Sequence, residues 1–397
     1  MVKKLHILEI ILLNIYTSIF FFKRLTYYAN IVILSTVGGT TMSNELSERL
    51  ISARKMAGIS LQELSERLDI DITKQALNKY EHGLSRPNGE TLVKIASVLG
   101  LPVDYFYRTK KIKLGPVEFR KYSHLKTSDI EKIKAECSDY LERYIELEEL
   151  INSKRPFNDP FKGSKQIINS DIDVEKAAEK LRDAWQLGRD PIAGVLPLLE
   201  DHGVRIYEIS APDSFSGMSA MVDGIPLIVL NKGNTDRLFS VQRKRFTALH
   251  ELAHLLLHFG DKEEKEIEKL CHSFAGAVLL PKERFIDWFG SNRNTISLQE
   301  LQMIDENYGI SVQAIIARAH TLSLISEQTH RDFNIWLSKN GKRKHEFVKD
   351  ICFNEKLSRF DRLLYKAVTE GIITESKGAS LANRKLASFR EEIIAIS

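Results

Sequence analysis

The stretch "RKRFTALHELAHLLLHF", residues 243–259, decides the fold of the central part of the chain. Its apolar residues recur at the spacing of a helix with one buried face, and the pattern predicts one long helix over residues 235–259. His250 and His254 stand four residues apart, so their side chains project from one helical face, close enough to share an ion. Neutral imidazole is the commonest metal ligand in proteins, which makes this helix a candidate metal-binding element.

Glu251 follows the first histidine and points to the side of the pair. From there its carboxylate can accept a proton from a reacting water. This H-E-x-x-H spacing is the arrangement of zinc peptidases. The alternative interpretation is a pair of core or surface histidines without a metal.

A catalytic zinc needs a third protein ligand and one open position. The predicted helix over 266–280 offers Glu266, Glu268 and His272. Glu268 is the preferred candidate, because it lies three residues before Cys271 and shares the apolar side of that helix. His272 remains an alternative ligand or a partner of the ligands.

Strands and helices around this motif predict a small α+β zincin-like domain over residues 166–292 in a mostly α-helical chain. A helix is expected over 173–188, and strands over 204–210 and 216–232. Asp223-Gly224 supplies the turn of a hairpin. The region 293–397 reads as helical, with Ser311 as a helix cap. Its end, near 373–386, either packs on the protein or senses a ligand, or forms a second DNA-reading unit.

Residues 44–108 predict five short helices that form a helix-turn-helix domain. Ser60 and Glu63 form a capping box, and Thr73 caps the helix that follows. That helix exposes groups able to contact bases or phosphates: Lys74, Gln75, Asn78 and Lys79. The region carries nine Lys/Arg and nine Asp/Glu, so charge does not decide between a DNA reader and a plain helical module.

Two resemblances sharpen these expectations. "TKQALNKYEHGLSRPNGETLVKIASVLGLPVDYFY", residues 73–107, resembles the phage-repressor (XRE) helix-turn-helix family, although "DIDI" before Thr73 makes a slightly longer turn. "RFTALHELAHLLLH" followed by "IEKLCHSFAGAVLLP" resembles the ImmA/IrrE family of metallopeptidases, in which an upstream repressor-type domain recurs. This second resemblance implies a Zn²⁺ cofactor and Glu268 as the third ligand. Cys271, His272 and the "LLP" ending depart from the family pattern, and His272 places a further imidazole near the metal.

Length, charge and cysteine content limit the number of domains, the partners and the cellular compartment. A length of 397 residues allows two or three domains, and a net charge of +4 permits nucleic acid without requiring it. Three widely spaced cysteines offer no disulfide framework, which favours a reducing cytoplasm. Residues 1–41 read as sequence upstream of a start at Met42, with a membrane anchor or a signal peptide as alternatives. No stable membrane association is expected.

Residues 109–165 read as a basic linker and a connector helix. Its lysines either add phosphate contacts or form a solvated linker. The apolar stripe of the helix either packs on a neighbouring domain or pairs with its copy in a homodimer.

The sequence thus predicts a regulator that binds a double-stranded DNA operator and cleaves a protein, such as a repressor, with Glu251 as the base. A catalytically silent sensor and the antitoxin of a toxin–antitoxin pair are the alternatives.

Overall fold

The computed structural model describes residues 41–108, 112, 125–164, 166–233, 239–342, 347–348 and 353–393. The expectation for residues 1–41 falls outside these ranges except at residue 41, and so does much of the expectation for the linker. Contacts divide the chain between residues 110 and 111 into two compact units. Within the described residues, no helix is long and apolar enough to cross a lipid bilayer.

Over its described residues, 41–108, the first unit is a small bundle of four α-helices and one 3₁₀ helix. They are α2 (Thr41–Met56), α3 (Leu61–Arg67), α4 (Lys74–Glu81), α5 (Gly89–Leu99) and η1 (Val103–Tyr107). The capping box at Ser60 and the cap at Thr73 are both present, as expected. The fifth helix is 3₁₀ rather than α, because its five residues follow Pro102 without a side-chain cap and close only tighter turns.

Short apolar side chains from every helix meet in the core of this unit, among them Leu50, Leu64 and Leu77. One ion pair supports the core at the end of α4. The Arg54 guanidinium donates two hydrogen bonds, of 2.6 and 2.8 Å, to the carboxylate of the buried Glu81. Glu81 belongs to the turn that ends α4, so this pair ties that turn to α2.

The second unit is built around a three-stranded sheet. Its elements up to residue 289 are α6 (Thr127–Leu150), β1 (Gln166–Ile167), α7 (Asp171–Ala184), α8 (Val195–Asp201), β2 (Arg205–Ile209), β3 (Gly217–Val222), β4 (Ile225–Asn231), α9 (Val241–Leu256), β5 (Leu257–His258), α10 (Glu264–Leu279) and α11 (Lys282–Phe289). The sheet order is β2-β4-β3, with β2 parallel and β3 antiparallel to β4. Asp223 and Gly224 both have positive φ, which forms the expected hairpin turn.

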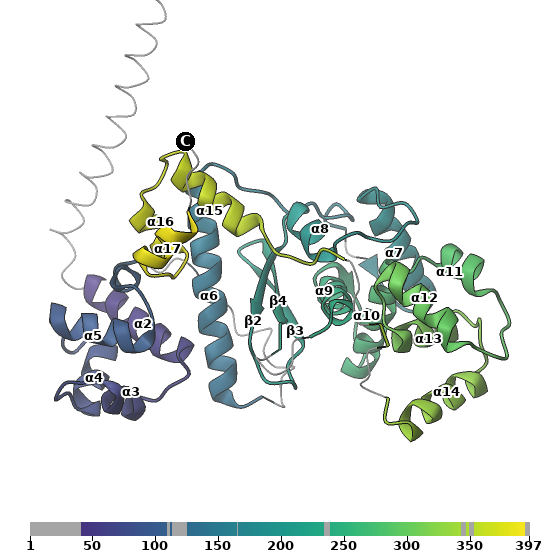
Figure 1. Cartoon of the computed structure of the whole chain (residues 1–397), viewed down its shortest axis with the longest axis horizontal. Helices are drawn as coiled ribbons and strands as arrows, with labels where there is room; N and C mark the ends of the chain where they lie inside the picture. Colours follow the sequence, from purple (N-terminus) through teal and green to yellow (C-terminus); the bar gives the residue numbers. More distant parts are fainter. Residues whose placement is uncertain are drawn as a thin grey trace, which may run out of the picture. The chain divides into compact units, whose positions relative to one another are not determined.

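Helices cover both faces of this sheet, as Figure 1 shows. Met218, Ala220 and Val222 face α6, in a cluster that includes Cys137 and Leu141. On the opposite face, Ile206, Ile228 and Leu230 join the core formed by α7, α8, α9 and α10. The apolar stripe of α6 therefore packs on this sheet, which is the first of the two alternatives for that helix.

The helix expected over 235–259 is shorter at both ends. It begins at Val241, because the hydroxyl of Ser240 accepts a hydrogen bond from the Arg243 amide and caps it. It ends at Leu256, because Leu257 adopts an extended conformation and pairs with Gln166 of β1. The motif itself remains wholly helical.

The C-terminal part adds further helices: α12 (Leu298–Tyr308), α13 (Val312–Thr321), α14 (Glu327–Lys339), α15 (Arg359–Thr369), α16 (Glu375–Leu381) and α17 (Leu386–Glu392). Ser311 caps α13, as expected. The last three helices pack on the end of α6, where Arg143 donates to the Leu381 carbonyl and Asn383 donates to Asp139. This packing matches the first alternative for the region near 373–386.

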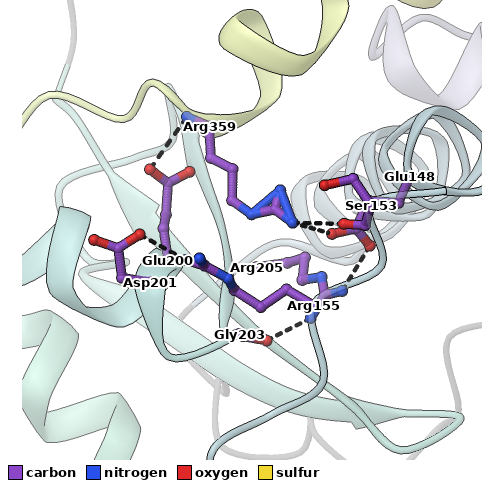
Figure 2. Close-up of polar contacts among 8 residues, drawn as sticks. All are labelled: Glu148, Ser153, Arg155, Glu200, Asp201, Gly203, Arg205 and Arg359. Atoms are coloured by element: carbon purple, nitrogen blue, oxygen red, sulfur yellow. Dashed lines mark hydrogen bonds and ion pairs between the residues drawn. The ribbon is translucent and has the colours of Figure 1, made fainter. Parts of the chain in front are cut away.

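Buried charges join α6, β2 and α15 (Figure 2). The carboxylate of Glu148 lies between two guanidinium groups, at 2.6 Å from Arg205 and 3.0 Å from Arg359. All three side chains are nearly excluded from solvent. Arg359 also donates to the Ser153 carbonyl, and Glu200 accepts from the backbone amide of Arg359.

Candidate metal centre

Helices α9 and α10 bring the expected ligands together. The apolar residues of α9 pack in a core that this helix shares with the sheet and with α10. The side chains of His250 and His254 also lie toward α10. Glu268 lies one turn into α10 and meets both histidines. The three residues form a group whose ligand atoms all lie within 4.8 Å of one another.

The distances within this group fit one zinc ion. The Nε2 atoms of His250 and His254 are 3.2 Å apart, and they lie 3.1 and 3.3 Å from the two carboxylate oxygens of Glu268. Ligands about 2.0–2.1 Å from a common zinc at tetrahedral angles stand about 3.3 Å from one another. The donor set, two imidazoles and one carboxylate, is one that catalytic zinc uses.

The electrostatics of the group also suit a cation. Hydrogen bonding to His250 and then to His254 holds the pKa of the Glu268 carboxyl well below its usual range. Glu268 is therefore a carboxylate at any neutral pH, the form that a metal ligand must have.

Glu251 lies beside the ligands and is held from the sheet. The hydroxyl of Ser219, on β3, donates a 2.9 Å hydrogen bond to Oε2 of Glu251, and both side chains are buried. Gly217 allows this close approach of strand and helix, because a Cβ there would lie 2.8 Å from Cγ2 of Thr247 and 3.4 Å from Cγ of Glu251.

Two of the three departures from the family pattern, Cys271 and His272, lie beside the ligands. The thiol of the buried Cys271 is 3.6 Å from Nδ1 of His254. The ring of His272 lies against that of His250, with centroids 4.5 Å apart. Burial, followed by the charge of His250, lowers the pKa of His272 to about 4. His272 is thus a neutral neighbour of the ligand group, and the ligand cluster found among the described residues does not include it.

These residues line a cavity of about 1080 Å³. His250, Glu251, His254 and Glu268 lie along its wall, and the cavity extends to His320 and His330 on α13 and α14. A space of this volume accommodates several residues of an extended peptide or a small molecule.

Sequence reasoning missed Ser219 and Gly217. Side chains alternate between the two faces of a strand, so residues 217 and 219 of the predicted strand were expected on the same face of β3. Nothing local indicated that this face would meet Glu251, thirty-two residues further along.

The four candidates for base or phosphate contacts lie on the second helix of the helix-turn-helix pair, α4. Lys74, Gln75, Asn78 and Lys79 are all exposed on α4, whereas Leu77 is buried in the core. Six residues, 68–73, connect α3 to α4, and the carbonyl of Ile72 accepts a hydrogen bond from Ser65.

Comparison with known proteins identifies two domain families. Residues 50–106 match the model described as helix-turn-helix, and residues 199–320 match the IrrE N-terminal-like domain. An uncharacterized HTH-type transcriptional regulator of Rickettsia prowazekii is 39% identical over 62 residues, which are 16% of this chain and 46% of that protein. An SPbeta prophage-derived uncharacterized HTH-type transcriptional regulator of Bacillus subtilis is 36% identical over 61 residues, 15% of this chain and 55% of that protein.

The chain thus spans about half the length of the curated relatives it matches. The range matched by the IrrE N-terminal-like model lies in the second unit and contains His250, His254 and Glu268. The chain therefore carries a helix-turn-helix domain of the phage-repressor (XRE) type followed by an IrrE N-terminal-like domain of the ImmA/IrrE type.

Proposed function

We propose that this protein is a DNA-binding transcriptional regulator whose second unit hydrolyses a peptide bond in another protein, with zinc at His250, His254 and Glu268. The observation that carries the proposal is the convergence of these three side chains at 3.1–3.3 Å beside a carboxylate, Glu251, that is held by its own hydrogen bond.

The metal, Glu251 and Ser219 have separate roles in the proposed reaction. Zinc, when bound, supplies a Lewis acid that polarises a carbonyl group and lowers the pKa of water toward about 7. The carboxylate of Glu251 accepts the proton of a water molecule as the water oxygen bonds to the peptide carbon. It then delivers that proton to the nitrogen of the leaving amine as the C–N bond breaks. Ser219 keeps the carboxylate in place during both transfers.

The presence of a helix-turn-helix unit favours a substrate that is itself bound near the same DNA. A peptidase joined to a DNA-binding unit meets proteins on neighbouring sites at a raised effective concentration. A repressor bound close to the same operator is the substrate class we propose.

The test separates metal binding from chemistry. Glu251→Gln keeps the shape of the side chain but cannot accept the proton, so the protein should retain zinc and lose about 10²–10⁴ in cleavage rate. His250→Ala or Glu268→Ala should release the metal, because three protein ligands are needed. Zinc content by atomic emission and the lifetime of candidate repressors in cells are the two measurements.

Either of two results would overturn parts of the proposal. Wild-type cleavage by Glu251→Gln would remove Glu251 as the base. Wild-type protein that holds zinc but leaves every candidate intact would favour a catalytically silent sensor that keeps the ligands for binding alone.

A further inference from the structure

A second group of metal-ligating side chains lines the wall of the cavity, away from the H-E-x-x-H motif. His320 lies at the end of α13, while Glu327 and His330 occupy the first turn of α14. Their ligand atoms all lie within 4.8 Å of one another. Both histidines line the cavity, so the group is accessible to an ion from solvent.

The chain between the two helices is anchored in the core and capped at the start of α14. Leu324 and Ile325, in the turn, are buried in the core. Ser326 caps α14 by accepting a hydrogen bond from the Thr329 amide. Glu327 and His330 are then one helical turn apart and share a face that meets the end of α13.

The group contains three potential metal ligands, one more than an ion pair contains. Nε2 of His320 is 2.7 Å from Oε2 of Glu327. An ion pair would need only these two residues, but His330 also stacks on His320, with ring centroids 4.6 Å apart and an angle of 10° between the planes. Neutral imidazole is the commonest metal ligand, and here two imidazole rings lie beside one carboxylate.

A neighbouring side chain contacts His330 as well. The Nδ2 atom of Asn334 lies 3.1 Å from Nε2 of His330 and donates a 3.0 Å hydrogen bond to its backbone carbonyl. Asn334 therefore helps to fix the position of His330 on α14.

We propose that His320, Glu327 and His330 form a second site for a divalent metal of the zinc class, which joins α14 to α13 at the wall of the cavity. Two imidazoles and one carboxylate suit zinc better than magnesium or calcium, which prefer oxygen ligands. Glu327 is 63% exposed and can move to complete the coordination. The site does not depend on peptidase activity.

The experiment isolates this group by removing the first site. Zinc-free full-length protein with His250→Ala and His254→Ala together is titrated with zinc in a calorimeter. We expect about one zinc ion per chain, and a loss of at least about tenfold in affinity when His330→Ala is added. His258→Ala, which removes an exposed histidine outside both groups, is the matched control and should leave the zinc bound.

Hydrogen exchange supplies an independent readout. Zinc should slow exchange of backbone amides in α13 and α14 of the doubly substituted protein, and this protection should vanish with His330→Ala. The proposal fails if the doubly substituted protein binds no zinc at micromolar concentration, or if His330→Ala leaves binding unchanged. If the double substitution prevents folding, His330→Ala in the otherwise wild-type chain must lower zinc content from about two ions to one, and an unchanged content refutes the site.

Discussion

The carboxylate of Glu251 can serve as a base only if it is held in one orientation beside the ligands. Its Oε2 atom accepts a hydrogen bond from Ser219, and both residues are buried between β3 and α9. A hydrogen bond to a charged group contributes about 1.5–3 kcal/mol. Ser219 is therefore a positioning residue that acts through Glu251 rather than on the substrate.

Removal of this hydroxyl tests the positioning role. Ser219→Ala should slow cleavage by about tenfold or more, because one lost hydrogen bond to a charged group is worth at least about 1.4 kcal/mol. Zinc content should stay at the wild-type value, since Ser219 does not contact the ligands. Ser216→Ala, whose hydroxyl accepts a hydrogen bond from Arg243 instead, is the matched control. Equal rates in the two variants would show that Ser219 only fills space.

At the scale of single elements, the sequence predicted the start of a helix correctly where the capping residue directly precedes that helix. Ser60, Thr73 and Ser311 each accept a hydrogen bond from an amide three residues later, and each begins the helix that the sequence indicates. The spacing of His250 and His254 likewise needs only one helix. These features depend on neighbours within one or two turns, which a sequence displays directly.

Elements defined by distant contacts were not visible in the sequence. Helix α8 follows Gly194, which offers no side-chain cap. The carboxylate of Glu355 instead accepts hydrogen bonds from the amides of Val195 and Leu196, about 160 residues earlier, and it also pairs with the buried Arg245. Strand β5 has the same kind of origin, because it exists only by pairing with β1. The contact of Glu251 with Ser219 belongs to this class too.

The next prediction concerns DNA recognition by the exposed face of α4. Gln75→Ala and Asn78→Ala should each lose about 1–3 kcal/mol of binding to the protein's own promoter and relax the sequence preference, because an amide can pair bidentately with adenine. Lys79→Ala should weaken binding to all sequences alike and lower its salt dependence. Fluorescence anisotropy at two salt concentrations distinguishes the two effects.

Lys180→Ala serves as the charge control for this experiment, because Lys180 lies on α7 in the second unit. Binding should not change with it. Equal affinity of the wild-type protein for promoter and random DNA would contradict specific reading by α4.

At the scale of the whole molecule, the two units have separate cores. The core of the first unit contains residues from 50 to 106, and the clusters of the second contain residues from 112 onward. Within the second unit, Glu148 links α6 to β2 and to α15 through two buried arginines. The C-terminal helices are therefore held to the sheet domain by a charged contact as well as by apolar packing.

Loss of Glu148 should destabilise the second unit and leave the first intact. Glu148→Ala leaves Arg205 and Arg359 buried without that carboxylate, which should lower the free energy of unfolding by about 3–5 kcal/mol. Trp185, Trp288 and Trp336 are the three tryptophans of the chain and all belong to the second unit, so their fluorescence in urea reports its unfolding alone. The exposed neighbour Glu149→Ala should change that transition by less than about 0.5 kcal/mol. DNA binding in the absence of urea should survive both substitutions; if Glu148→Ala abolished it, the first unit would depend on the second for its fold.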